Sequence, residues 1–114
     1  MLRKDRAFSH SAVRGGGVFV FVNRNLSVVE TDISSIYNEL ELICFDLLRV
    51  QTKLRFFTVY RPPYSDCAAE QYLHLLIECF KQYTEGTQIN VIVGDLNCPK
   101  IDWNTVGYHL HAIA

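Results

Sequence analysis

Residues 88–99 read QINVIVGDLNCP, and this stretch decides the fold that the sequence predicts. From Ile89 to Val93 the residues are mostly β-branched and apolar, which is typical of a strand covered on both faces of a sheet. Gly94 is expected to end the strand. Asp95 and Asn97 then emerge at the carboxyl end of a central strand, where α/β sheets commonly hold polar functional groups. Two interpretations stay open here: a turn whose Asp and Asn bond to nearby backbone, and the edge of a catalytic site.

The residues before this stretch predict a hairpin and then a helix. Residues 40–48 (LELICFDLL) and 54–60 (LRFFTVY) have the composition of two strands, and the short polar segment between them suits an antiparallel hairpin. Two prolines, at positions 62 and 63, end the second strand because proline cannot donate to a ladder. An apolar stripe at helical spacing then predicts a helix from about Cys67 to Thr84.

The beginning of the chain leads through a glycine run into a further strand. Residues 14–17 read RGGG, and the VFVFV that follows predicts a strand at 18–22. A strand in this place argues against a phosphate-binding loop, which needs a helix after its glycines. Residues 23–38 predict a polar connection with a short helical turn. Together the elements indicate a single α/β domain of the α+β type over residues 1–114.

Composition limits the function classes. Hydrophobic residues make up 49% of the 114 residues and charged residues 20%, which is enough apolar material for a packed core. The net charge of −1 excludes a strong overall positive field, so any binding of DNA is expected to be local and weak. No apolar stretch is long enough to span a membrane, and the basic start lacks the apolar core of a secretory signal. We therefore expect an intracellular location, nuclear or cytoplasmic, and no membrane partner.

The cysteines and the late histidines favour packing over metal binding. The four cysteines form no CxxC pair and are widely separated, which is typical of reduced, buried thiols. His109 and His111 could face the same way on a strand. A metal site there is disfavoured, because no Cys or carboxylate stands at partner spacing.

The order of the motifs resembles one protein family. RGGG, a strand ending in YRPP (60–63), an amphipathic helix and VIVGDLNCP (91–99) together resemble the endonuclease/exonuclease/phosphatase (DNase I-like) superfamily. More narrowly, they are similar to the apurinic-type endonuclease domain of non-LTR retrotransposons, over about residues 3–103. The resemblance implies a four-layer α-β-β-α sandwich with two mixed β-sheets. It also implies a Mg²⁺-dependent phosphodiesterase that acts on DNA and accompanies a reverse transcriptase domain in its parent element.

The resemblance assigns roles to three residues. Asp95 matches the acid of the GDxN motif, which would orient or deprotonate the attacking water. Asn97 would hold the scissile phosphate oxygens or the water shell of the metal, and Tyr60 would reach the phosphate from the neighbouring strand end. In-line attack on a phosphodiester needs such a base and such donors around the developing negative charge. For Mg²⁺ the resemblance implies only indirect contacts from Asp95 and Asn97.

Two motifs of the family are absent from residues 1–114. Its metal-binding Glu, in an E-T-W-like motif, lies upstream of the basic segment, and its His, in an S-D-H motif, lies far beyond Trp103. We therefore expect an internal piece of the domain, truncated at both ends and inactive as it stands. Exposed strand edges and an open inner sheet face would make such a piece poorly soluble or dependent on a partner. The alternative is a small α/β module that binds a nucleotide or a protein without catalysis.

Overall fold

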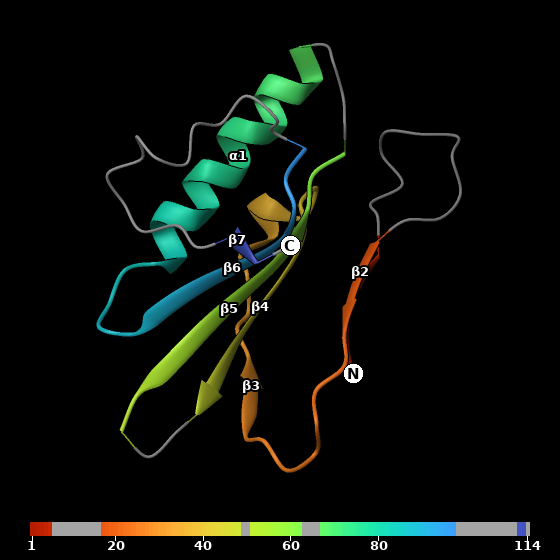
Figure 1. Cartoon of the computed structure of the whole chain (residues 1–114). Coiled ribbons are helices and arrows are strands. Elements are labelled where there is room, and N and C mark those ends of the chain that lie inside the picture. The colour runs from red at the N-terminus through yellow and green to blue at the C-terminus, as the bar shows by residue number, and fades with distance from the viewer. Residues whose placement is uncertain (6–16, 49–50, 63–66, 98–111, 114) are drawn as a thin grey trace.

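The structure is a computed structural model of the whole chain, and it describes residues 1–5, 17–48, 51–62, 67–97 and 112–113 (Figure 1). A five-stranded mixed sheet carries a helix on one face and a two-stranded sheet on the other. The α/β fold of the α+β type that the sequence predicts is confirmed. Residues 14–16, Cys98, His109 and His111, which also entered the predictions, lie outside the described residues.

The larger sheet has an antiparallel half and a parallel half. Its strand order is β3-β4-β5-β6-β7, with β3 antiparallel to β4, β4 antiparallel to β5, and β5, β6 and β7 parallel. The β4–β5 hairpin confirms the strands predicted at residues 40–48 and 54–60. The bounds are β3 Val28–Glu30, β4 Glu41–Leu48, β5 Lys53–Tyr60, β6 Ile89–Asp95 and β7 Ala112–Ile113.

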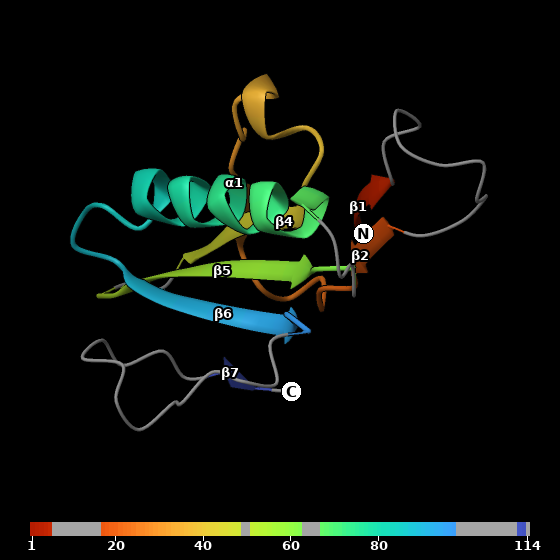
Figure 2. The ribbon, with the colours of Figure 1, turned by 90° about the horizontal axis from the view of Figure 1, so that it is seen from above.

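One helix, α1 (Cys67–Tyr83), connects the parallel strands β5 and β6 and runs along the sheet (Figure 2). Its bounds confirm the helix predicted from the apolar stripe. Leu76 and Cys79 of α1 pack against Phe57 and Val59 of β5, and all four side chains are buried. Burial of a large apolar side chain of this kind stabilises a fold by roughly 1.5–3 kcal/mol.

Two of the cysteines are part of this core. Cys44 of β4 and Cys79 of α1 are free, buried and members of one apolar cluster. Burial raises the pKa of the Cys79 thiol to about 12, so this thiol stays protonated and unreactive at neutral pH. The prediction of packing cysteines is confirmed for these two.

The second sheet covers the face of β4 and β5 that is opposite to α1. It consists of β1 (Leu2–Asp5) and β2 (Gly17–Val20), which pair antiparallel. Val18 of β2 packs against Ile43 and Phe45 of β4. The strand β2 confirms the prediction at 18–22, although it begins one residue earlier and ends two residues earlier. In the described residues this second sheet is an antiparallel pair, whereas the resemblance implies two mixed sheets.

Three strands and one burial pattern differ from the predictions. β1, β3 and β7 were not predicted from the sequence, whereas the turn expected within residues 23–38 is present as a 3-10 helix, η2 (Ser35–Tyr37). The prediction that both faces of β6 are covered is wrong, because only Ile92 of this strand is buried. The two-stranded sheet lies over β4 and β5, and Val91 and Val93 on that face of β6 are only half-buried. Within the described ranges, no helix has the length and apolar character needed to cross a membrane.

Candidate functional site

Tyr60 and Asp95 lie side by side at one edge of the sheet. The strands β5 and β6 run side by side and end at the same edge (Figure 2). Their parallel register pairs Tyr60 with Asp95, the last residue of each strand. Residues paired in this way project to the same face of a sheet. Tyr60 packs against the Val18 cluster, on the face away from α1, and Asp95, which is exposed, therefore projects from that face too. Two segments that are distant in sequence thus bring a phenol and a carboxylate together.

Glu41 extends this row by one strand. The antiparallel register of β4 and β5 places Glu41 opposite Tyr60, so that an acid, a phenol and an acid follow one another across three strands. Glu41 is only 2% exposed. Sequence reasoning missed it, because an acid at the start of an apolar strand suggests a solvated strand end. The signal in the sequence was its spacing from Ile43 and Phe45, since alternate residues of a strand share one face and these two are apolar.

Asn97 does not continue the extended strand. Its φ of 47° turns the chain, and its backbone N–H donates to Oδ1 of Asp95 at 3.0 Å. Asn is one of the few residues that adopt such a φ readily, and an Asp two positions earlier commonly accepts this hydrogen bond. The turn interpretation of the sequence therefore describes the local backbone correctly. Strand alternation does not carry the side chain of Asn97 to the side of Asp95, because the chain is no longer extended there.

The side chain of Asn97 contacts Arg61 instead. Its amide Nδ2 donates to the carbonyl oxygen of Arg61 at 2.6 Å. Arg61 is 9% exposed, and its guanidinium donates to the carbonyl oxygens of Leu96 at 3.3 Å and Asn97 at 3.2 Å. Sequence reasoning used Arg61 only as one letter of YRPP and gave it no role. The signal in the sequence was a charged residue between an apolar strand and two prolines, because an arginine that is buried there needs hydrogen-bond acceptors.

A tyrosine of α1 joins the same ends of β4 and β5. The Tyr72 hydroxyl accepts from the backbone N–H of Glu41 at 2.9 Å and donates to the carbonyl oxygen of Tyr60 at 3.1 Å. Tyr72 lies in the helix predicted from the apolar stripe, and no role was predicted for its hydroxyl. The edge that carries Tyr60 and Asp95 is therefore held from the helix side as well as by Arg61.

These side chains do not make a magnesium site by themselves. In the part of the chain that the structure describes, no group of three or more His, Cys, Asp or Glu is placed to hold a metal ion. Glu41 and Asp95 stand two strands apart, which corresponds to roughly 10 Å between their Cα atoms. Carboxylates that bind one Mg²⁺ approach it to about 2.1 Å. The described residues therefore supply at most part of the ligand set for the Mg²⁺ that the resemblance implies.

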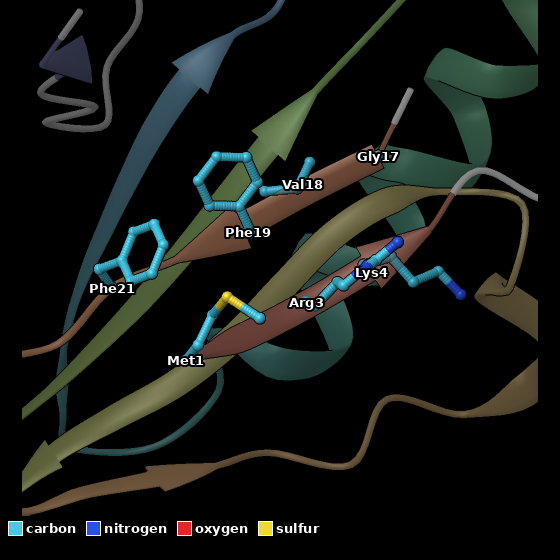
Figure 3. A pocket seen from close by; sticks show the side chains of 7 residues that line it. All are labelled: Met1, Arg3, Lys4, Gly17, Val18, Phe19 and Phe21. Atoms are coloured by element: carbon cyan, nitrogen blue, oxygen red, sulfur yellow. The ribbon is translucent and has the colours of Figure 1, made fainter. Parts of the chain in front are cut away.

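A separate hollow lies on the outer side of the small sheet. It encloses about 480 Å³ and does not involve Tyr60, Asp95 or Asn97; Figure 3 shows its lining of Met1, Arg3, Lys4, Gly17, Val18, Phe19 and Phe21. Phe19 is 61% exposed and Phe21 74%, and their rings meet edge to face at 5.3 Å. We call Phe19 and Phe21 the aromatic patch. Exposed rings of this kind favour contacts between molecules.

Removal of the aromatic patch is expected to reduce self-association. In the double variant Phe19→Ser with Phe21→Ser, two exposed rings no longer contribute apolar area to contacts between molecules, while the neighbouring core residue Val18 is unchanged. Sedimentation velocity over a concentration series measures the effect. Ile36→Ser is the matched control, because Ile36 is equally exposed but lies on η2. An unchanged sedimentation profile of the double variant would show that the patch does not drive association.

Comparison of the chain with models of known protein families, with characterised proteins and with solved structures gives no match. Its function is therefore inferred from its own residues and their arrangement.

Proposed function

We propose that the edge formed by Tyr60 and Asp95 is one half of a Mg²⁺-dependent endonuclease site for DNA phosphodiester bonds, in a domain of the DNase I-like sandwich type. The register of β5 and β6 carries this proposal, because it aligns the tyrosine of YRPP with the aspartate of GDLN at one sheet edge. The order of those motifs along the chain supports the same assignment.

The two side chains suit different tasks in phosphodiester hydrolysis. Asp95 offers an exposed carboxylate, which can align a water molecule and accept its proton. The Tyr60 hydroxyl can donate to a phosphate oxygen, on which negative charge grows during attack. Mg²⁺, when bound, would supply further neutralisation of that charge. Since the described residues supply only part of a Mg²⁺ ligand set, we expect this chain to bind DNA weakly and not to cleave it.

Mg²⁺ dependence of DNA binding tests the proposal. A carboxylate at the edge repels phosphate without a metal and attracts it through one, so Mg²⁺ is expected to strengthen binding of a duplex oligonucleotide to the wild type. Without Mg²⁺, Asp95→Asn is expected to bind the duplex more tightly than the wild type does. With Mg²⁺, it is expected to lose most of the stimulation of binding, a reduction of roughly tenfold, which corresponds to one charge-assisted hydrogen bond. Fluorescence anisotropy with and without Mg²⁺ measures both quantities. Glu85→Gln, an exposed charge in the segment before β6, is the matched control.

Each outcome of this experiment decides something. An identical Mg²⁺ effect on the wild type and on Asp95→Asn would contradict the proposed site. Binding of free nucleotides with no affinity for DNA would favour the non-catalytic module. A parallel assay with supercoiled plasmid tests cleavage: Mg²⁺-dependent nicking that Asp95→Asn abolishes would confirm the site and overturn the expectation that this chain is inactive.

A further inference from the structure

We infer that Arg61 and Asn97 form a strap that positions Asp95, and that Asn97 serves this edge through Arg61 rather than by binding phosphate. The strap is the set of hydrogen bonds that joins residue 61 to residues 95–97. Its effect on the turn after β6 stands independently of function, whereas its importance for catalysis rests on the proposed phosphodiesterase site.

The strap joins two segments in both directions. The backbone N–H of Arg61 donates to the carbonyl oxygen of Asp95 at 2.8 Å, one step beyond the end of β5. The Arg61 guanidinium then donates to the carbonyl oxygens of Leu96 and Asn97, at 3.3 and 3.2 Å. In return, the Asn97 amide donates to the carbonyl oxygen of Arg61 at 2.6 Å. Every backbone carbonyl from residue 95 to residue 97 therefore accepts a hydrogen bond from Arg61.

The strap reaches the Asp95 carboxylate through Asn97. Because Asn97 is held by Arg61, its backbone N–H is fixed where it donates to Oδ1 of Asp95 at 3.0 Å. That hydrogen bond sets the rotation of a carboxylate that is otherwise exposed to solvent. A water-orienting acid works only within a narrow range of positions, so fixing its rotation has a direct effect on catalysis.

The residue types match these positions. At a φ of 47°, Asn is tolerated, and its amide supplies the donor that the Arg61 carbonyl accepts. Aspartate at the same place would set a carboxylate oxygen against that carbonyl. At position 61, the guanidinium nitrogen Nη1 carries two N–H groups in a fixed plane and donates to both carbonyl oxygens, whereas a lysine ammonium has no such fixed plane.

Hydrogen exchange in the full chain tests the strap. The exposed turn at residues 23–25 is a matched internal control, because the Asn25 N–H donates to Oδ1 of Asn23 at 2.9 Å with the same spacing along the chain. The Asn97 N–H is expected to exchange at least tenfold more slowly than the Asn25 N–H in the wild type, after correction for sequence. In Arg61→Met and in Asn97→Gly the difference is expected to disappear, and Arg61→Lys is expected to restore part of it. Asn97→Gly keeps the positive φ accessible, so it isolates the loss of the amide.

A positioning role also predicts a functional readout. Arg61→Met and Asn97→Gly are expected to lose the Mg²⁺ stimulation of DNA binding that depends on Asp95, with partial rescue in Arg61→Lys, while exchange of the buried β5 amides at Phe57 and Val59 is unchanged. If the wild type lacks that stimulation, the proposed function fails and exchange at residue 97 still decides the strap. Unchanged exchange at residue 97 in both variants would overturn the strap. A loss of DNA binding in Asn97→Gly without any change in exchange would instead assign Asn97 to the phosphate.

Discussion

Gly94→Ala is expected to unfold the end of β6 and to remove the candidate site with it. Gly94 has a φ of 140°, which side chains rarely allow, and an added Cβ would lie 1.8 Å from the carbonyl oxygen of Val59. Val59 is the partner of Gly94 in the β5–β6 ladder, so the clash is with backbone that cannot move without breaking the register. Backbone strain and overpacking together are expected to lower the free energy of unfolding by roughly 2–6 kcal/mol. Urea denaturation followed by circular dichroism measures this loss.

Gly86→Ala is the matched control for this substitution. Gly86 also has a positive φ, of 117°, but its added Cβ would meet Oε1 of the Gln88 side chain, at 2.4 Å. A flexible side chain can turn away, so the expected loss is only about 1 kcal/mol. Equal losses in the two variants would show that positive φ alone, and not the approach of β5 to β6, makes glycine necessary at position 94.

Asp46→Ala is the second substitution for which we expect a large effect. Asp46 of β4 is 6% exposed and accepts two hydrogen bonds from Arg55 of β5, at 2.7 Å from Nε and 3.0 Å from the second guanidinium nitrogen. The same guanidinium donates to the carbonyl oxygen of Tyr83 at 2.9 Å, which ties the last residue of α1 to the sheet. Removal of the carboxylate leaves a largely buried cation and is expected to cost about 3–5 kcal/mol of stability. Thermal and urea denaturation measure the loss.

This ion pair also predicts the acid limit of stability. The Arg55 guanidinium holds the pKa of Asp46 below its ordinary value of 3.8. Because the pKa of Asp46 is lower in the folded protein, the ion pair contributes its full stabilisation at any pH above the ordinary pKa. This stabilisation is lost as the pH falls from the ordinary pKa to the lower pKa of the folded state. Unfolding free energy measured from pH 6 to pH 2 is therefore expected to fall more steeply in the wild type than in Asp46→Asn. Parallel curves for the two proteins would contradict this assignment.

Two further variants separate the buried pair from ordinary surface charge. Lys53 also contacts Asp46, at 3.2 Å, but it is partly exposed, so Lys53→Met is expected to cost less than about 1 kcal/mol. Asp46→Leu combined with Arg55→Met removes both charges and is expected to recover most of the stability lost in Asp46→Ala. A double variant as unstable as the single one would show that shape, and not charge, decides this position.

The parts of the fold that were predicted correctly have a repeating pattern over many residues. The β4–β5 hairpin and α1 each contain so many apolar residues at a regular spacing that single polar residues do not hide the pattern. β1 and β3 have at most four residues and lie in polar stretches, so their conformation depends on the strands with which they pair. Burial of β6 was overestimated because an apolar strand does not reveal how far the neighbouring layer extends.

The candidate site was predicted only in part. A strand-end position and the motif order indicated Tyr60 and Asp95, and the structure brings these two together. The hydrogen bonds of Arg61, Asn97 and Tyr72 could not be predicted, since their acceptors come from segments that are brought together only by folding. A local pattern contains donors and acceptors but does not state which of them meet. Only the φ above zero at Asn97 had a recognisable local cause, because Asn after an Asp-Leu pair favours a turn.

The Tyr72 hydroxyl has a mechanical consequence for the whole layer that α1 forms. It bridges the backbone of β4 to that of β5, so one rotation and one axial setting of the helix satisfy both hydrogen bonds. A slip of α1 by a single residue would move the phenol by about 1.5 Å along the helix axis and turn it away from the sheet. Together with the hydrogen bond from Arg55 to the carbonyl oxygen of Tyr83 at the other end of α1, the Tyr72 hydroxyl therefore fixes the position of the helix along the sheet, which apolar contacts specify less sharply.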